Sequence, residues 1–271
     1  MALLPQSILR DADGSDYPRH RESLPESSFE HGRYILRFAR DRGQLERILR
    51  LRYQVFNLEL GEGLDESKST GLDRDRFDAG CHHLMVVDRT SGDIVGTYRL
   101  QTSAMATSHC GFYSDGEFDL GAMPEEMRAR SVELGRACIS LSHRNRQVLF
   151  LLWRGLAAYV VHNQARYFFG CSSLTSQDPR DGKAMLELLT ARGDAHPSLV
   201  VPPRQGFECI VEPGCKTLPE VEIPSLFRTY LRYGAKVCGP PAMDREFKTI
   251  DFFMLFDLSA LDARTYRLFF E

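Results

Sequence analysis

A strand-like stretch that carries two opposite charges constrains this chain more than any other feature. Residues 131–140 read SVELGRACIS, with small and apolar side chains on both sides of Gly135, which is typical of a buried strand. Glu133 and Arg136 stand within it. In a regular strand these two side chains would point to opposite faces. A β-bulge at Gly135 would add one residue, bring both charges to the same face and leave backbone N–H groups unpaired.

This bulge predicts a cleft. A bulged strand splays the sheet, and its unpaired N–H groups can stabilise a carbonyl oxygen that gains negative charge. We therefore expect Glu133, Arg136 and these amides to face one cleft. The alternative is an ion pair of purely structural value at a strand end.

The rest of the chain alternates between strand-like and helix-like patterns. Strands are expected at 34–39, 82–88, 94–102, 166–174, 207–211 and 250–258, and helices at 44–60, 147–165, 179–192 and 225–234. Residues 103–130 are expected to be irregular. This order, with a hairpin at 82–102, predicts an α/β or α+β fold in which helices flank a mixed sheet. Residues 1–32 are polar without periodicity and are expected to form a flexible arm, followed by a single domain at 33–271.

Further charges stand where a core is expected. Arg52 falls within the apolar stripe of helix 44–60, so its guanidinium either extends along the helix to water or meets an acid. Asp73, Asp75 and Asp78 follow in a loop, where solvation is the usual outcome, and Arg99 lies in a strand. The loop has no EF-hand continuation, so no metal is expected. If the fold joins these groups, three arginines and the acids would compensate one another.

Composition excludes several classes of protein. A net charge of −3 argues against a nucleic-acid binder. The longest apolar run, at 148–153, is too short to span a bilayer, and the N-terminus shows no signal pattern. Seven cysteines without a C-x-x-C pair indicate a reduced protein. We expect a cytoplasmic location, with contact to the inner membrane surface left open.

A series of motifs resembles a known family. The motifs are LRYQVF, DRDRFD, VGTYRL, FYSDGEFDL, ELGRACIS, LLWRGLAAY, FGCSS, YLRYGAKV and DREFKTIDFFMLF, in this order over 34–258. The series resembles the bacterial ornithine-lipid N-acyltransferases and the long-chain N-acyl amino acid synthases. Both are GNAT-like N-acyltransferases related to the acyl-homoserine lactone synthases. The resemblance implies a sheet that opens into a V at a bulged central strand, where acyl-phosphopantetheine lies.

The resemblance also implies site residues. Those that match the lactone synthases are Arg52 and Phe56, Asp73, Asp75 and Asp78, Arg99, and Glu133 with Arg136. Lactone synthases usually carry a tryptophan after the first helix, and this chain does not, which argues against S-adenosylmethionine as a substrate.

The pyrophosphate loop of ordinary GNAT acetyltransferases is absent as well. SHRNRQ stands in its place. Arg144 and Arg146 there suit one phosphate of phosphopantetheine and an acidic carrier protein, with solvated loop arginines as the alternative.

The implied reaction is transfer of a long, 3-hydroxy acyl chain from acyl carrier protein to an amino acid, ornithine first, without a tightly bound cofactor. Glu133 is the first choice for the base and Asp73 the second. The backbone at Ala137, Cys138 and Ile139 would supply the oxyanion N–H.

The remaining expectations concern substrate contacts and competing functions. Arg52, Arg99 and Arg136 would orient the acids, and one would hold the acceptor carboxylate. Trp153, Phe168 and Phe169 either line the acyl chain or only pack in the core. The alternative mechanism forms an acyl-Cys138 intermediate, with His143 as a neighbour. The alternative functions are a lactone-type signal synthase, a synthase of other N-acyl amino acids, and a non-catalytic lipid- or carrier-binding module.

Overall fold

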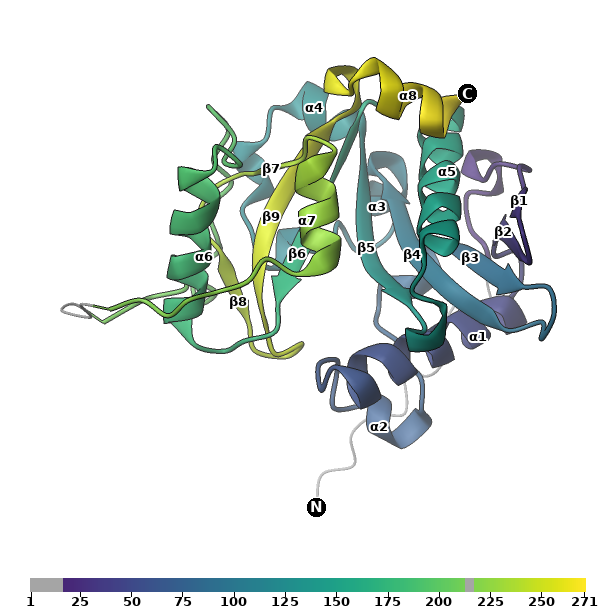
Figure 1. The fold of residues 1–271 in the computed structure, drawn as a ribbon, viewed down its shortest axis with the longest axis horizontal. Coiled ribbons are helices and arrows are strands. Elements are labelled where there is room, and N and C mark those ends of the chain that lie inside the picture. Colours follow the sequence, from purple (N-terminus) through teal and green to yellow (C-terminus); the bar gives the residue numbers. More distant parts are fainter. Residues whose placement is uncertain (1–16, 213–216) are drawn as a thin grey trace.

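The computed structural model describes residues 17–212 and 217–271, and its centre is one mixed sheet (Figure 1). Neighbouring strands pair antiparallel, except that β5 and β6 run parallel. The strand order is β1 (Phe29–His31), β2 (Tyr34–Phe38), β3 (His82–Asp88), β4 (Ile94–Thr102), β5 (Ser131–Ile139), β6 (Tyr167–Leu174), β9 (Thr249–Asp257) and β7 (Lys236–Val237), with β8 (Ala242–Asp244) also on β9. The predicted mixed sheet with flanking helices is confirmed.

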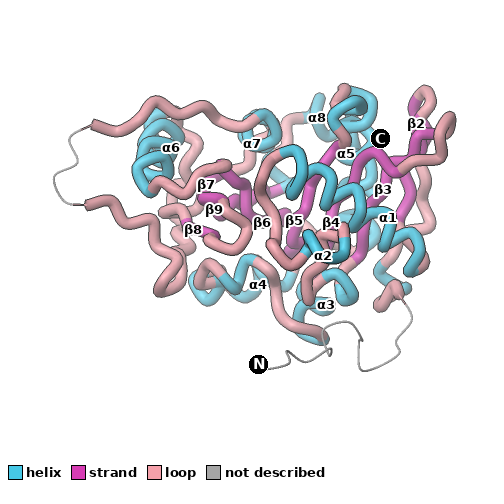
Figure 2. Tube along the Cα trace, turned by 90° about the horizontal axis from the view of Figure 1, so that it is seen from below, coloured by secondary structure: helices cyan, strands magenta, loops and turns pink. Residues whose placement is uncertain are grey.

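Helices cover both faces of the sheet. Figure 2 shows α5 (Arg146–His162), α6 (Pro179–Ala191), α7 (Ser225–Arg232) and α8 (Ala263–Phe270) along one side of the strands, and α3 (Ser103–Ser108) and α4 (Glu125–Ala129) along the other. Strand alternation explains the two faces. Leu84 of β3 packs in the core beneath α5, whereas its neighbour Met85 packs with Leu45 of α1 (Arg42–Tyr53). The helix α2 (Ser67–Thr70) lies in the loop that follows.

Local sequence signals fix where the main helices begin. The Asp41 side chain accepts a hydrogen bond from the Gln44 N–H at 2.8 Å, and Asn145 accepts two N–H bonds at the start of α5. Pro179 occupies the first turn of α6, where its missing N–H costs nothing. The helix expected at 44–60 exists, but its last part, Gln54–Glu59, is a π-helix.

The sheet opens between β5 and β6. These strands pair only where Ser131, Val132 and Glu133 face 167–169, and beyond that point they separate (Figure 1). Gly170 marks the point of closest approach, since a Cβ there would lie 2.2 Å from the Leu134 carbonyl oxygen. Only glycine fits at this position, so the sequence itself determines where β5 and β6 begin to separate.

The predicted bulge is present in β5, one residue later than expected. Thr97 of β4 pairs with Cys138 and Arg99 pairs with Gly135, so Arg136 and Ala137 together face a single residue of β4. The extra residue is Arg136, whose φ of 47° is left-handed. The glycine ends the regular pairing, and the arginine supplies the bulge.

Three segments differ from expectation. Tyr17 is buried and donates its hydroxyl hydrogen bond to His83 Nδ1 at 2.8 Å, and Leu24 packs in the core, so residues 17–32 lie against the domain instead of forming an arm. Residues 1–16 lie outside the described part. The segment 207–211 is a loop that makes one isolated bridge, from Glu208 to Ala242, because it runs outside the sheet. Short helices occupy parts of 103–130, which had no periodicity.

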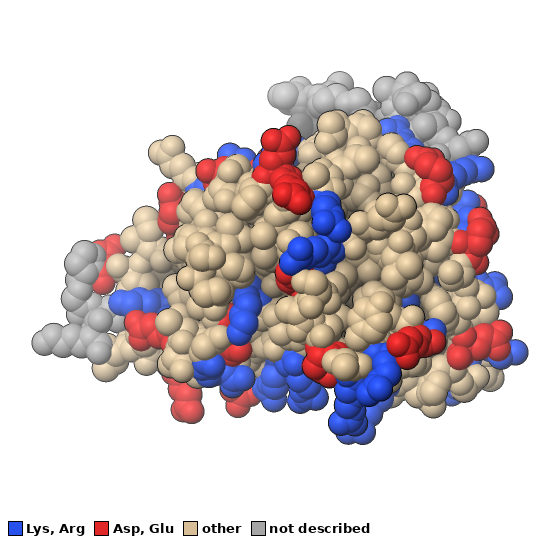
Figure 3. Space-filling view, turned by 90° about the horizontal axis from the view of Figure 1, so that it is seen from above, with Lys and Arg blue, Asp and Glu red and all other residues tan. Residues whose placement is uncertain are grey.

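The surface carries both signs of charge. On the face in Figure 3, basic and acidic side chains lie among one another with uncharged areas between them, in keeping with the net charge of −3. Across the described ranges, none of the helices has both the length and the apolar character that a membrane crossing requires.

Candidate active site

A cavity of about 320 Å³ occupies the V between the separated strands. Because neighbouring side chains on a strand point to opposite faces, the cavity has two unlike ends. The polar end includes Gln101, Tyr113, Ser114, Glu133, Cys171 and Asp251. The apolar end includes Tyr98, Trp153, Phe168, Phe227, Met254 and Phe256. The cavity therefore joins a polar site to an apolar space through the opening of the sheet.

Arg52 is completely buried, with 0% of its surface exposed. Its Nε donates to Asp73 Oδ2 at 2.7 Å, and its Nη1 donates to Asp78 Oδ1 at 2.6 Å. The guanidinium meets acids, and the alternative of extension to water is wrong. Burial alone would lower the pKa of Arg52, but the two aspartates outweigh it and raise that pKa.

Two further arginines complete this group. Arg99 Nη1 lies 2.6 Å from Asp75 Oδ2 and 3.2 Å from Asp78 Oδ1. Arg136 Nη2 lies 3.1 Å from the same Asp75 oxygen. Burial is the largest single influence and favours the neutral acids, but the neighbouring groups together outweigh it. Arg52, His83 and Arg99 do so at Asp78, and Arg99, Arg136 and Arg52 do so at Asp75, so both carboxyl pKa values lie below their usual range. We call Arg52, Arg99, Arg136, Asp73, Asp75 and Asp78 the arginine–aspartate cluster. It is the compensating network that the sequence predicted.

Glu133 lies at the cavity wall beside this cluster. Its two carboxylate oxygens accept the backbone N–H groups of Tyr113 at 2.9 Å and Ser114 at 2.7 Å. The Arg136 guanidinium stands 4.7 Å above the Tyr113 ring, so Glu133 and Arg136 share a neighbour and a face, as the bulge required. Burial raises the pKa of Glu133, against the two N–H bonds that favour its charged form.

A second group of acids lies near Tyr113, and the sequence analysis missed it. We call Glu117, Asp244 and Asp251 the acidic cluster. Tyr113 donates its hydroxyl hydrogen bond to Asp244 at 3.0 Å, and Asp251 lines the cavity. The signal for Asp251 was available, because an acid within the apolar strand TIDFFMLF is the same anomaly as Glu133.

The acidic cluster has strongly perturbed pKa values. Burial, followed by the charge of Asp244, raises the pKa of Asp251 to about 6. Burial, followed by Asp251 and Asp244, raises that of Glu117 well above its usual range. One ligand atom each from Glu117, Cys171 and Asp251 lies within 4.8 Å of the others. These acids are close enough to compete for protons and for any cation that enters.

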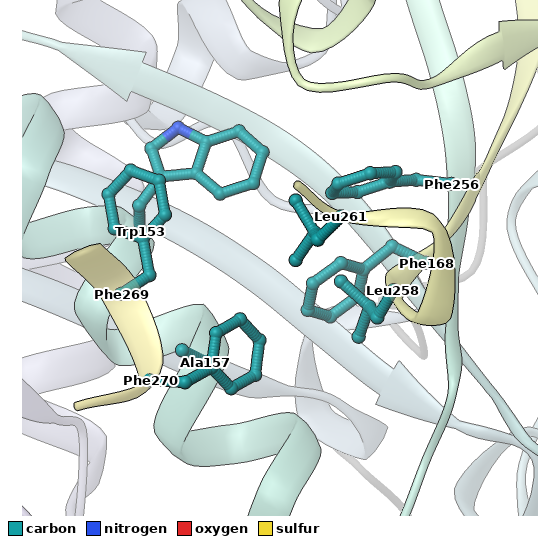
Figure 4. A pocket seen from close by; sticks show the side chains of 8 residues that line it. All are labelled: Trp153, Ala157, Phe168, Phe256, Leu258, Leu261, Phe269 and Phe270. Atoms are coloured by element: carbon teal, nitrogen blue, oxygen red, sulfur yellow. The ribbon is translucent and has the colours of Figure 1, made fainter. Parts of the chain in front are cut away.

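Four aromatic residues that the sequence singled out line the cavity. They are Phe56, which matches the lactone synthases, and Trp153, Phe168 and Phe169, for which acyl-chain contact and core packing were the alternatives. Trp153 and Phe168 also line a second, smaller apolar space, which the C-terminal helix α8 closes with Phe269 and Phe270. Figure 4 shows these rings converging from α5, β6, β9 and the C-terminal segment. The apolar end therefore continues toward α8 behind a wall of aromatic rings.

Other predicted residues lie elsewhere. Asp73 is completely buried and is not part of the cavity wall. Cys138 packs among the apolar residues beneath α1, and burial raises its pKa to about 12, so it is poorly placed as a nucleophile. His143 contacts the Tyr34 hydroxyl at 3.1 Å and not Cys138. Of the three residues expected to offer an oxyanion N–H, Ala137 lines the cavity, whereas Cys138 and Ile139 do not.

The loop arginines are exposed. Arg144 donates to the Ile139 carbonyl at 3.0 Å and lies 2.5 Å from Glu59, next to the cavity residue Leu60. Arg146 opens α5, but Asn145 already accepts the Gln147 and Val148 N–H bonds there. Any phosphate at this place would therefore meet side chains more than free helix amides.

Comparison with known proteins agrees with this geometry. The L-ornithine N(alpha)-acyltransferase of Rhodobacter capsulatus is 31% identical over 240 residues, which cover 85% of this chain and 92% of that protein. The chain belongs to this N-acyltransferase family. The enzyme of the same name from Agrobacterium fabrum is 30% identical over 84% of this chain and 82% of that protein.

Domain and structure comparisons extend the result. Residues 51–154 match the acetyltransferase (GNAT) domain family. An N-acyl amino acid synthase from uncultured soil microbes shares the fold, with a TM-score of 0.50 and 9% identity over 84% of this chain and 94% of that chain. The protein is an N-acyltransferase enzyme, which overturns the alternative of a non-catalytic binding module.

Proposed function

We propose that this N-acyltransferase moves a long 3-hydroxyacyl chain from acyl carrier protein to the α-amine of ornithine, which makes a lyso-ornithine lipid. The observation that carries the proposal is the cavity itself, which joins Glu133 and Arg136 to an apolar space lined by Trp153 and Phe168. A polar acceptor and a long acyl chain need such unlike ends. The names of the relatives support ornithine as the first acceptor to test.

The chemistry starts with the acceptor amine. Glu133 takes one proton from the α-ammonium, directly or through a water, and the free amine attacks the thioester carbonyl. The C–N bond forms, the C–S bond breaks, and the second amine proton leaves with the thiol. A raised pKa suits Glu133 to this task because it strengthens the carboxylate as a base.

Two features of the bulge suit the developing oxyanion and the acceptor. Ala137 follows the bulged residue on a strand that has no partner strand on its cavity side, so its backbone N–H is our choice of oxyanion donor. Arg136 lines the cavity, and its Nε lies 3.6 Å from Asp73 Oδ2 without a hydrogen bond. Its guanidinium is our choice of partner for the acceptor carboxylate.

Direct attack is favoured over a covalent acyl-cysteine. Cys138 lies outside the cavity wall and its raised pKa leaves little thiolate. Cys171 does line the cavity, but burial followed by Glu117 and Asp251 raises its pKa well above the usual range. Neither thiol has an activating histidine among its described contacts.

The donor is proposed to approach past Arg144 and Arg146. Both are exposed near the π-helix end of the cavity, where an acidic carrier protein and its phosphopantetheine phosphate would meet positive charge. Replacing both by alanine should raise KM for acyl carrier protein substrates several-fold and leave kcat nearly unchanged. An unchanged KM would remove these residues from the proposal.

The decisive assay uses purified protein with acyl carrier proteins of several chain lengths, with and without a 3-hydroxyl group, and a panel of amino acids. Mass spectrometry should detect N-acyl products, with ornithine as the preferred acceptor. Absence of product with every amine, or product only from CoA thioesters, would contradict the proposal. Product with S-adenosylmethionine alone would favour a lactone-type synthase.

Glu133→Gln tests the base. We expect kcat to fall by about 10²- to 10⁴-fold. Because an amide cannot accept both N–H bonds from Tyr113 and Ser114, thermal stability must be measured in parallel. Glu187→Gln, on the exposed face of α6, is the matched control. A folded Glu133→Gln enzyme with normal kcat would rule out this residue as the base.

A further inference from the structure

The acidic cluster forms no ion pair with a basic side chain in the described ranges, although the charge of Arg136 acts on Glu117 and Asp251 from further away. The arginine–aspartate cluster sets three guanidinium groups against three carboxylates. By contrast, the ion pairs of residues 17–212 and 217–271 include none with Glu117, Asp244 or Asp251. Buried charge of one sign without a partner is costly, and proteins usually keep it where a ligand supplies the opposite charge.

Asp251 shows where such a ligand would bind. The residue is 3% exposed, it lines the cavity, and its Oδ1 atom is buried without a hydrogen-bond partner. A buried carboxylate oxygen without a donor indicates a missing partner. Glu62 lines the cavity nearby, but its Oε1 already accepts a hydrogen bond from Thr175.

The position of Asp251 relative to Glu133 fits one acceptor molecule. Both residues lie at the polar end of the same cavity, and Cys171 connects them. Its Sγ lies within 4.8 Å of an Asp251 oxygen and 3.5 Å from the hydroxyl of Ser114, whose backbone N–H binds Glu133. Tyr113 connects the two acidic sites, because its backbone N–H binds Glu133 and its hydroxyl binds Asp244. A ligand with two amines could reach both sites.

We propose that Asp251, supported by Asp244 and Glu117, binds the side-chain ammonium of the acceptor and thereby selects amino acids that carry a second amine. The α-amine of the same molecule lies at Glu133. This inference rests on the proposed transfer of an acyl group to an amino acid, and it adds the residue that distinguishes ornithine from a neutral acceptor.

The protonation of the cluster is consistent with one bound cation. Burial, followed by the charges of Asp251 and Asp244, raises the pKa of Glu117 well above its usual range, which favours its neutral form. Asp251, whose pKa is about 6, is mainly ionised at pH 7. The carboxylate that faces the cavity is thus charged, as an ammonium partner requires.

A divalent metal is the competing occupant, since Glu117, Cys171 and Asp251 offer three ligand atoms within 4.8 Å. We favour the ammonium because the Cys171 thiol resists ionisation, whereas a metal needs the thiolate. Dialysis against a chelator distinguishes the two. The preference for acceptors with a second amine should be unchanged after dialysis against the chelator. Preference that is lost with the chelator and restored by a divalent ion would overturn the inference.

The main test compares ornithine with norvaline, which has the same carbon chain and lacks the second amine. Wild-type kcat/KM should be higher for ornithine. In Asp251→Asn it should fall by about 10- to 100-fold for ornithine and change little for norvaline. Glu187→Gln should leave both values unchanged. Activity with norvaline also shows that the variant is folded.

Other outcomes separate the two proposals. No product with any acceptor, in the wild type, would contradict the proposed function itself. Equal losses with ornithine and norvaline would place Asp251 at the reacting amine and overturn the side-chain assignment. A variant in which the ratio of kcat/KM for ornithine to kcat/KM for norvaline is unchanged would also overturn it. Calorimetric binding of each amino acid to the enzyme without donor should show the same loss for ornithine alone.

Discussion

Two groups of buried charge meet at Tyr113, and they differ in whether their charges cancel. In the arginine–aspartate cluster, Arg52 is fully enclosed and bonded to two aspartates. In the acidic cluster, Asp251 retains an oxygen without a partner. The first arrangement fixes the loop 73–78 against α1 and β4. The second stores unfavourable free energy at a cavity, which a bound cation would release.

The largest effect should come from breaking the balanced group. Arg52→Met leaves Asp73 and Asp78 buried without their main partner, and we expect the free energy of unfolding to fall by about 3–5 kcal/mol. Denaturant unfolding measures it. Arg50→Met, on the exposed side of the same helix, should cost under about 1 kcal/mol. Equal losses in the two variants would show that the cluster contributes no more than a surface pair.

The free energy of unfolding, measured at several pH values, should show contributions of opposite sign from the two groups. The raised pKa of Asp251 means that the folded protein holds a proton that the unfolded chain releases between about pH 4 and 6. The free energy of unfolding therefore falls as pH rises through this window. For Asp75 and Asp78, whose pKa values are lowered, stability is present above about pH 4 and is lost as pH falls further.

Asp251→Asn isolates the first of these contributions. The wild-type free energy of unfolding minus that of the variant should fall by about 1–3 kcal/mol between pH 4 and pH 6. Denaturant curves at each pH give the difference. A difference that stays constant, or that rises with pH, would show that Asp251 is not destabilised by its charge and would remove the contrast between the clusters.

The smallest effect tests the residue that joins the groups. Tyr113→Phe keeps the ring beneath Arg136 and removes the donor to Asp244, so we expect a loss of about 1–2 kcal/mol. Tyr266→Phe, on the exposed side of α8, should change stability by less than about 0.5 kcal/mol. If Tyr113→Phe costs as much as Arg52→Met, the two groups act as one network and not as two.

The balanced group was predictable and the unbalanced one was not, for a physical reason. A charged residue within an apolar pattern is visible in the sequence, and this signal identified Arg52, Glu133 and Arg136. The cost of an unpaired buried charge left two alternatives for Arg52, extension to water or an acidic partner, and the family resemblance pointed to Asp73, Asp75 and Asp78. Asp251 carries the same signal but belongs to no motif with a known partner, and Glu117 lies in a stretch without periodicity, so only the folded chain brings them together.

The fold shows the same division. Long periodic segments such as α5 and the hairpin β3–β4 were predicted within a few residues, because one face of each is apolar. The bulge was deduced from the spacing of Glu133 and Arg136, although it lies at Arg136. The packing of 17–32 was not foreseen, since single anchors such as Tyr17 and Leu24 produce no period.

The short contact between β5 and β6 has a consequence for how the sheet ends. Beyond Glu133 and Phe169 the two strands have no pairing with each other, so the molecule possesses strand edges in its interior. Unpaired strands at the outer edge of a sheet can pair with strands of other chains, so proteins protect them with charged side chains or proline. Here the unpaired backbone is shielded by α5 and α7, and it faces only what can enter a cavity of about 320 Å³. In the proposed reaction, the substrate would take the place of a missing strand.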